Sequence, residues 1–320
     1  MPSTATPKTL RIMFLGDLVG SPGVAMFEKW VPRLKEKFKI DTVVVNGENS
    51  SKNGRGISPE VAEQLQAAGA NVITSGNHIW SNKKIYSLVE EGNILLRPAN
   101  YPSACPGKGY AVIEVKGQQV AIINLLGRVF MREDLECPFR AIESLLMFLT
   151  QKTNVVFVDF HAEATSEKHA MRHFLDGKVS GIFGTHTHIQ TSDEEILSSG
   201  TSYITDLGFC GSIRSALGVD QNIILERFLK QMPAHFKVET KGPMAMNGIW
   251  VEVEVATGAV RHQRRFREVR PDVQVGEVPG RPPLSKHADP LPSLHERALS
   301  NPREDRVQVA EHQDDTAVIL

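Results

Sequence analysis

The sequence predicts an α/β protein built on a largely parallel sheet, and two observations support this prediction. Short apolar runs alternate with segments of helical periodicity from residue 10 to residue 266. In addition, several of these runs end directly before residues of metal-ligand type. Because α/β proteins collect functional groups at the carboxyl ends of their strands, we expect helices over the sheet faces and a site at one edge. The 320 residues are enough to bury a large core.

The first part of the chain predicts strands that alternate with helices. Proline suits the first helical turn, so one helix is expected to open at Ser21-Pro22-Gly23 and another at Ser58-Pro59-Glu60, with Ser58 as N-cap. Pro32 falls inside the first helical pattern and predicts a kink or a break there. The expected strands are 10–15, 42–45 and 71–74, with a polar loop over the site at 50–57 and a short helix at 84–90.

The rest of the domain adds hairpins and further strand–helix units. Lys116-Gly117-Gln118 predicts the turn of one hairpin, and Thr257-Gly258 predicts the turn of another. The predicted helices are 139–150 and 167–175, and the predicted strands are 110–115, 119–125, 155–160, 179–183, 202–205, 248–255 and 259–266.

Both ends of the chain differ in character from this domain, which we place at residues 10–268. Residues 1–9 form a short polar leader that we expect to be flexible. From residue 269 to residue 320, prolines stand among charged and small residues with few apolar anchors. A segment of this kind cannot bury enough apolar surface to fold, so it predicts a disordered proline-rich tail.

Composition and charge exclude several classes of protein. The formal net charge is −1, so whole-chain electrostatics favour neither nucleic acid nor an anionic membrane as partner. Cys105, Cys137 and Cys210 are widely spaced and form no CxxC pair, which favours a reducing compartment over a disulfide framework. The sequence contains neither a signal-peptide core nor an apolar run long enough to span a bilayer. We therefore expect a cytoplasmic protein without a membrane partner, and homo-oligomerisation stays open.

Oxygen and imidazole donors follow the predicted strands. They are too many for one tetrahedral ion and suit two ions that share a carboxylate. His186 and His188 are two residues apart, so on an extended segment they would face the same side. No cysteine belongs to the set, which therefore fits iron, manganese or zinc better than magnesium or calcium. Two adjacent ions suit in-line displacement at phosphorus. The donors are Asp17, Glu48, Asn49, Asn77, His161, His186 and His188, with His78 beside them.

Several motifs resemble, in order and spacing, the calcineurin-like metallophosphoesterases, and more narrowly their YmdB-like branch of bacterial cyclic-nucleotide phosphodiesterases. The resemblance extends from about residue 10 to residue 266. One of its motifs alone is weak, whereas the ordered set is specific. The set is Gly16-Asp17-Leu18-Val19-Gly20-Ser21-Pro22-Gly23, Asn46-Gly47-Glu48-Asn49, Gly76-Asn77-His78, Arg97-Pro98-Ala99-Asn100-Tyr101-Pro102, Gly127-Arg128-Val129-Phe130-Met131, residues 159–168 and Gly184-Thr185-His186-Thr187-His188.

The resemblance implies a fold of layered β-sheets flanked by helices, and it implies a role for each donor. Glu48 would bridge two metal ions, divalent or of mixed valence, with iron ranked ahead of manganese and zinc. Val19 stands where the wider superfamily has a histidine, and Asn49 would replace that ligand. One ion would be completed by Asp17, Asn49 and His188, and the other by Asn77, His161 and His186.

The implied reaction is hydrolysis of a small phosphodiester, a 2′,3′- or 3′,5′-cyclic nucleotide, by a metal-bridging hydroxide. His78 would bind no metal; it would stabilise the phosphoryl group or protonate the leaving oxygen, which suits an imidazole beside a metal ligand. No substrate-binding residue is assigned. The alternatives are a phosphomonoesterase, an RNA-processing diesterase, or a metal-bound regulatory protein that acts by binding. RNA therefore stays open as a partner, although the net charge disfavours nucleic acid.

Other polar residues near these motifs allow either a functional or an ordinary structural interpretation. Glu163 or Glu167 could support an imidazole, although a helix cap is the simpler explanation. Asp206 would support the ligands at most indirectly. The basic run 261–267 favours a solvated strand edge over an RNA contact. Phosphate contact or a solvated loop is open for Lys52 and Arg55, and phosphate contact or a surface salt bridge is open for Arg128. Packing is expected for Trp30, Trp80 and Trp250.

Overall fold

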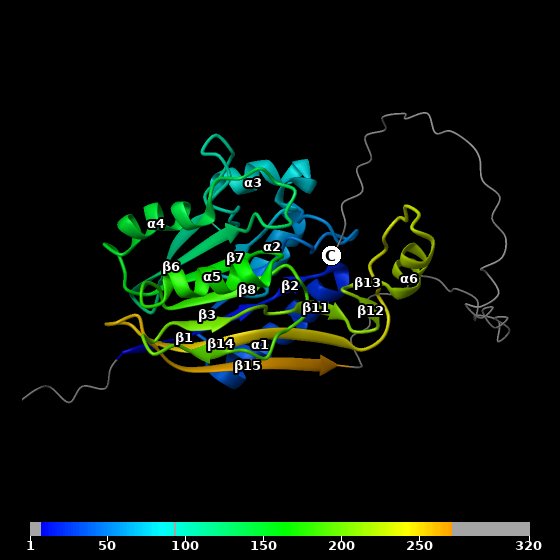
Figure 1. Ribbon diagram of the computed structural model, residues 1–320. Coiled ribbons are helices and arrows are strands. Elements are labelled where there is room, and N and C mark those ends of the chain that lie inside the picture. Colours follow the sequence, from blue (N-terminus) through cyan, green and yellow to red (C-terminus); the bar gives the residue numbers. More distant parts are fainter. Residues whose placement is uncertain (1–7, 93, 271–320) are drawn as a thin grey trace, which may run out of the picture. The chain divides into compact units, whose positions relative to one another are not determined.

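Two β-sheets packed face to face form the centre of the computed structural model, which describes residues 8–92 and 94–270. Figure 1 shows the sheets stacked, with helix α1 (Gly20–Phe38) beyond one sheet and helix α4 (Pro138–Leu149) beyond the other. The layered sheets are confirmed, whereas the single, largely parallel sheet predicted from the alternation of strands and helices is wrong. A strand that is apolar on both faces looks the same in sequence whether a helix or a second sheet covers it.

The first sheet joins the N-terminal strands to the C-terminal hairpin. β1 (Thr9–Leu15), β3 (Thr42–Asn46) and β4 (Val72–Thr74) run parallel. β14 (Met244–Glu254) pairs antiparallel with β1 and with β15 (Val260–Arg270), which confirms the predicted final hairpin with longer strands.

Two short strands extend the first sheet toward the candidate site. β11 (Phe209–Ser212) pairs antiparallel with β14 and parallel with β2 (Asp17–Leu18). Neither strand is part of the sequence prediction, because each is too short to show a period of two. Their pairing gives Asp17 a fixed place at the sheet edge.

The second sheet has the order β5-β6-β7-β8-β10-β9. Its four central strands run parallel, and both edge strands are antiparallel to their neighbours. The central strands end on the same side as β1, β3 and β4 do, toward the candidate residues. The strands are β5 (Tyr110–Val115), β6 (Gln118–Leu126), β7 (Val156–His161), β8 (Gly181–Thr185), β9 (Glu195–Ile196) and β10 (Ser202–Ile204).

An aromatic cluster joins the two sheets. The Phe14 ring from β1 lies 5.0 Å from the Phe157 ring and 4.5 Å from the Phe183 ring, centroid to centroid. All three side chains are buried. Tilted rings at these distances gain about 0.5–1.5 kcal/mol per pair beyond their area burial, so this cluster fixes one sheet against the other.

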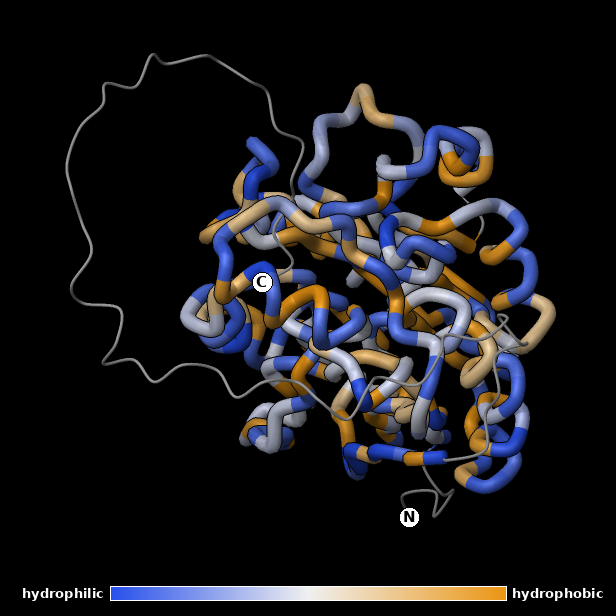
Figure 2. Tube along the Cα trace, turned by 90° about the vertical axis from the view of Figure 1, so that its right-hand side faces the viewer, coloured by the Kyte–Doolittle hydropathy of each residue, from blue (hydrophilic) through white to orange (hydrophobic). Residues whose placement is uncertain are grey.

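Helices cover the two outer faces. α1 and α2 (Pro59–Ala67) bury Phe27 and Leu65 against the first sheet, and α4 and α5 (Thr165–Leu175) pack on the second. In Figure 2 hydrophobic and hydrophilic stretches alternate along the helical turns, as expected of helices with one buried face. Ser58 caps α2 as predicted, with its Oγ 3.3 Å from Val61 N.

Helix α1 runs unbroken through Pro32, so of the predicted kink or break the break is wrong, and the kink stays a prediction. Pro32 is exposed, while Val31 and Leu34 beside it are buried. The proline ring therefore meets solvent and removes one helical hydrogen bond, whereas burial of its neighbours holds both halves of the helix on the sheet.

Several short elements surround the candidate site. Residues 50–57 form an irregular loop, as predicted. Two 3-10 turns precede α3 (Tyr86–Glu91), and the ribbon β12 (Ser215–Ala216) and β13 (Val219–Asp220) leads into α6 (Gln221–Lys230). The sequence prediction omits this ribbon, α6 and β9.

The predicted leader and tail fall largely outside the described residues; at their inner ends, Thr9 starts β1 and Arg270 ends β15. Within the described part of the chain, none of the helices has the length and apolar character needed to cross a membrane.

Candidate active site

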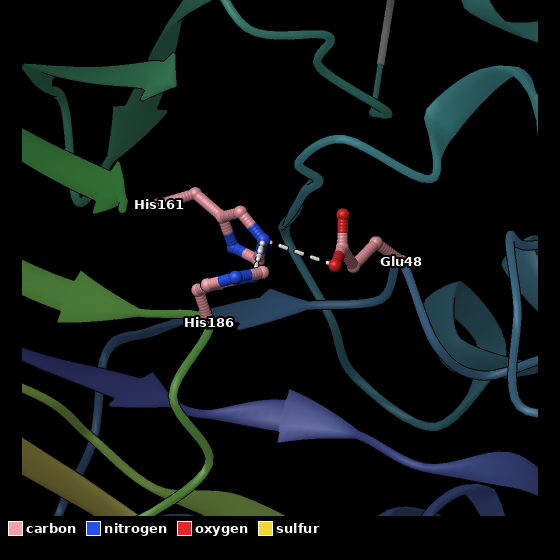
Figure 3. A group of neighbouring side chains, drawn as sticks. All are labelled: Glu48, His161 and His186. Atoms are coloured by element: carbon pink, nitrogen blue, oxygen red, sulfur yellow. Dashed lines mark hydrogen bonds and ion pairs between the residues drawn. The ribbon is translucent and has the colours of Figure 1, made fainter. Parts of the chain in front are cut away.

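The candidate residues meet where the parallel strands of both sheets end. Asp17, Glu48 and Asn77 come from the first sheet, and His161 and the histidines after β8 come from the second. Figure 3 shows the side chains of Glu48, His161 and His186 pointing toward one another across the junction of the sheets. These three residues form a group able to hold a metal ion.

Four donor atoms converge at the buried imidazole of His161. Its Nε2 atom lies 3.0 Å from Glu48 Oε1, 3.2 Å from Asn77 Oδ1 and 3.0 Å from His186 Nδ1. His161 and Glu48 are almost fully buried. The structure thus brings together four of the seven predicted ligands around one point.

A hydrogen-bond chain determines the tautomer of His161. Thr185 Oγ1 donates its proton to Asp159 Oδ1 at 2.6 Å. Because the hydroxyl has no second proton, Thr185 Oγ1 accepts from His161 Nδ1, 2.9 Å away. The Asn46 amide also lies 3.4 Å from this Nδ1, but the Thr185 contact is shorter, so we assign the proton of His161 to Nδ1 and its lone pair to Nε2. Burial lowers the pKa of His161 to about 4, which keeps the ring neutral at pH 7.

The imidazole of His186 lies between His161 on its Nδ1 side and a carboxylate on its Nε2 side. Its Nε2 atom lies 3.1 Å from Glu163 Oε2, and its backbone N–H donates to Asp17 Oδ2 at 3.2 Å. With the proton on Nε2, the Nδ1 lone pair faces His161. Glu163 thus supports an imidazole, one of the two interpretations that its sequence position allowed.

A second group of donors surrounds His188. Its Nδ1 atom donates to the carbonyl oxygen of Leu217 at 3.0 Å, so its Nε2 lone pair points at Asn49 Oδ1, 3.3 Å away, and at Asp17 Oδ1, 3.7 Å away. Asn49 Nδ2 donates to Gly54 O, which turns the amide oxygen toward the histidine. Asp17 Oδ1 is buried without a hydrogen-bond partner among the described residues.

The two histidines after β8 do not share one face of a strand, contrary to the prediction. β8 ends at Thr185, and His186 and His188 have φ values of 96° and 63°. Such values are uncommon for non-glycine residues and concentrate at functional sites. The irregular backbone aims His186 at the first group of donors and His188 at the second.

His78 lies beside Glu48 without joining either group. Its backbone N–H donates to Glu48 Oε2 at 3.1 Å, and its backbone is in the bridge region, at φ −93° and ψ 6°. Burial lowers the pKa of His78, while the carboxylate of Glu48 opposes that shift. The half-buried imidazole is thus positioned at the edge of the site.

A buried ion pair supports the segment between the two histidines. Lys168 Nζ lies 2.7 Å from Asp206 Oδ2 and donates to Thr185 O at 2.8 Å. Asp206 accepts from Thr187 N at 3.1 Å and from Thr187 Oγ1 at 2.7 Å. Asp206 therefore acts through the backbone, as the indirect role suggested. Lys168, Thr185 and Asp159 have no role in the sequence prediction; the one signal was an aspartate in an otherwise apolar strand.

The remaining candidates divide between surface and packing roles. Glu167 accepts hydrogen bonds from the backbone N–H groups of Arg128 and Val129, so it neither caps a helix nor supports an imidazole. The basic run lies on β15, where Arg261 and Arg265 pair with Glu254 and Glu194. The packing predicted for the tryptophans is confirmed, since all three contact the core.

The comparisons agree with this geometry. Residues 13–266 match the model of the YmdB-like protein family. A 2′,3′-cyclic-nucleotide 2′-phosphodiesterase of Bacillus subtilis is 41% identical over 248 residues, covering 78% of this chain and 93% of the relative. Among solved structures, a phosphatase of Mycoplasma pneumoniae has a TM-score of 0.78 at 35% identity, covering 83% of this chain and 96% of its own. A hypothetical protein of Thermus thermophilus has a TM-score of 0.76 at 35% identity, covering 82% and 100%.

The fold and these relatives define a class of protein: a hydrolase of phosphoric esters with the metallophosphoesterase fold. Within that class, the chain belongs to the YmdB-like family.

Proposed function

We propose that the protein is a dinuclear-metal phosphodiesterase that hydrolyses cyclic nucleotides. The observation that carries the proposal is the convergence on His161 Nε2, an unprotonated nitrogen with three other donor atoms within 3.2 Å. The activity of the Bacillus subtilis relative supports 2′,3′-cyclic nucleotides as the first substrates, with 3′,5′-cyclic nucleotides second. The free cysteines are consistent with a cytoplasmic location, which belongs to the same proposal.

The donor set fits metal ions. Ligands at ~2.1 Å from one ion and at right angles to each other lie about 3 Å apart, which matches the spacing around His161 Nε2. Without a cation, lone pairs would face one another there, and Asp17 Oδ1 would remain buried with no partner. We assign Asn77, His161 and His186 to one ion, Asp17, Asn49 and His188 to the other, and Glu48 to both.

Imidazole and oxygen ligands without thiolate favour iron, manganese or zinc, and we rank iron first. When bound, two such ions supply a hydroxide nucleophile at neutral pH and positive charge for the phosphoryl oxygens. The protein's own contribution is to keep the ligand nitrogens free. Thr185 and the Leu217 carbonyl hold the protons of His161 and His188 on Nδ1, and the Glu163 carboxylate lies 3.1 Å from His186 Nε2.

His78 completes the proposed machinery. Its backbone N–H bonds Glu48 Oε2, and to its half-buried imidazole we assign a hydrogen bond to a phosphoryl oxygen or a proton for the leaving oxygen. The two roles differ in pH dependence. A proton donor requires the imidazolium, and because burial lowers the pKa of His78, such a role would make the rate fall as pH rises through a value below 6.5.

The experiment compares the parent with His188→Ala and His78→Ala in the presence of manganese. The substrates are bis-p-nitrophenyl phosphate, both classes of cyclic adenosine phosphate, and p-nitrophenyl phosphate as monoester. We expect His188→Ala to lose both turnover and metal, and His78→Ala to lose turnover by about 10²–10⁴-fold with metal retained. Full activity in His188→Ala contradicts the ligand assignment, and preference for the monoester contradicts the diesterase.

A further inference from the structure

Phe130 occupies a tight turn directly after β6. Residues 128–131 form the turn, closed by a hydrogen bond of 3.2 Å from Met131 N to Arg128 O. Phe130 is the third residue of the turn and has a φ of 63°. Glycine or asparagine ordinarily fills that position, because a side chain at positive φ meets its own backbone.

The aromatic ring gains nothing from packing that would offset this strain. Phe130 is 85% exposed, the most exposed of the large apolar side chains in the described part of the chain. A strained backbone and an exposed ring both oppose folding, and strained residues of this kind concentrate where ligands bind.

The turn is joined to the candidate site through Gly127. Before it, Gly127 N donates to His161 O at 2.9 Å, and a Cβ on Gly127 would lie only 2.6 Å from the side chains of Ala162 and Glu167. Phe130 is three residues after Gly127, so its Cα lies within about 11 Å of the Cα of Gly127.

The backbone of the turn is held rigidly in place. Glu167, on α5, accepts hydrogen bonds from Arg128 N at 3.1 Å and from Val129 N at 3.2 Å. Arg128 itself is exposed, and within residues 8–92 and 94–270 its guanidinium makes no ion pair. A turn held by Glu167 therefore carries an exposed aromatic ring and an exposed cation two residues apart, close in the chain to Gly127, which bonds His161.

From this geometry we propose that Phe130 stacks on the base of a nucleotide whose phosphodiester lies at the donor groups. The inference rests on the proposed function and adds a base-recognition element to it. An aromatic face stacks on any base, so this contact selects nucleotides over base-free phosphodiesters without selecting one base. Arg128 adds positive charge for an anionic ligand on the same turn.

The test compares adenosine 2′,3′-cyclic phosphate with methyl riboside 2′,3′-cyclic phosphate, which lacks the base. The key variant is Phe130→Gly, because glycine removes the ring and also relieves the positive φ, so that loss of folding cannot explain a defect. We expect KM for the adenosine compound to rise about 10- to 100-fold with kcat little changed, and the base-free compound to be unaffected. Phe130→Trp should behave as the parent.

Phe148→Ala serves as the control, since Phe148 is an exposed aromatic residue on α4 and is outside the site. Equal losses on both substrates, or no change on either, overturn the stacking role. A parent that cleaves neither substrate contradicts the proposed function instead. In that case a binding measurement tests the inference. The adenosine compound should quench the fluorescence of the tryptophan that Phe130→Trp adds to the parent, and absence of quenching overturns the stacking role.

Discussion

Asp159 Oδ1 accepts a hydrogen bond of 2.6 Å from the Thr185 hydroxyl, and this contact leaves the hydroxyl oxygen to accept the proton of His161 Nδ1, 2.9 Å away. Burial raises the pKa of Asp159 to about 6, against hydrogen bonds from Thr185, Thr74 and Asn46, so the carboxyl is ionised at neutral pH. The carboxylate takes the hydroxyl proton, the hydroxyl oxygen takes the proton of Nδ1, and Nε2 remains free. Strands β7 and β8 are paired parallel, which fixes all three groups in register.

Thr185→Val should weaken metal binding while keeping the shape of the side chain. Loss of a group that orients a ligand histidine typically lowers metal affinity 10- to 100-fold. We expect the activation curve with added manganese to shift by that factor and the maximal rate to recover at excess metal. Thr150→Val, at the end of α4 where the hydroxyl bonds Leu146 O, is the matched control. Identical curves for Thr185→Val and the parent would contradict the role of the relay.

The buried His161 should make the metal-free protein sensitive to acid. Its folded-state pKa of about 4 lies below the unfolded value of 6.5, so between these values the unfolded chain binds the extra proton. Stability attributable to His161 is therefore present above pH 6.5 and is lost as pH falls toward 4, by on the order of 3 kcal/mol.

Urea denaturation of chelator-treated parent and His161→Asn at pH 7 and pH 4.5 measures this contribution. Comparison of the two proteins removes the contributions of other groups, including Asp159, whose raised pKa acts in the opposite direction. The parent should lose more stability than the variant on acidification. A difference between them that does not change with pH would show that His161 titrates normally.

Lys168→Met should destabilise the fold strongly. The change leaves the fully buried Asp206 carboxylate without its cation, and breaking a buried pair from one side costs about 3–5 kcal/mol. Lys230→Met, which breaks an exposed pair with Glu226 on α6, should change stability little. The midpoint of thermal unfolding measures both, and similar shifts in the two variants would mean that the buried pair is not essential.

Pro32→Ala should stabilise the protein. Because α1 continues through this exposed position, alanine restores a helical hydrogen bond and removes the ring's clash with the preceding turn, for a gain of about 1–3 kcal/mol. Chemical denaturation measures the change. Loss of stability in the variant would show that α1 needs the distortion that proline imposes in order to follow the sheet.

The candidate residues could be predicted because each follows an apolar run, and a polar donor at a strand end can be recognised from the sequence alone. Asp17, Glu48 and His161 all stand at such ends. Their supporting groups could not be predicted in the same way. Asp159 and Thr185 lie inside strands. Lys168 lies on helix α5, and its partner Asp206 is 38 residues further along the chain. Such pairs depend on tertiary packing, which no local period encodes.

The layering of the sheets shows the same limit. Phe14, Phe157 and Phe183 mark three buried strands in the sequence, yet nothing local indicates that they face one another across two sheets. Likewise, the extended geometry expected for His186 and His188 fails because positive φ at both residues is imposed by their surroundings, including Asp17 and Asp206. The resemblance to a known family supplied what periodicity did not.

The most direct test of the two-metal diesterase is a stepwise reconstitution of the metal-stripped protein. Manganese is added in fractions of one equivalent, while bound metal and the rate of adenosine 2′,3′-cyclic phosphate hydrolysis are measured on the same samples. If both donor groups hold an ion, binding saturates at two equivalents per chain and most of the rate appears with the second. Full rate at one equivalent, or hydrolysis without metal, would contradict the dinuclear site.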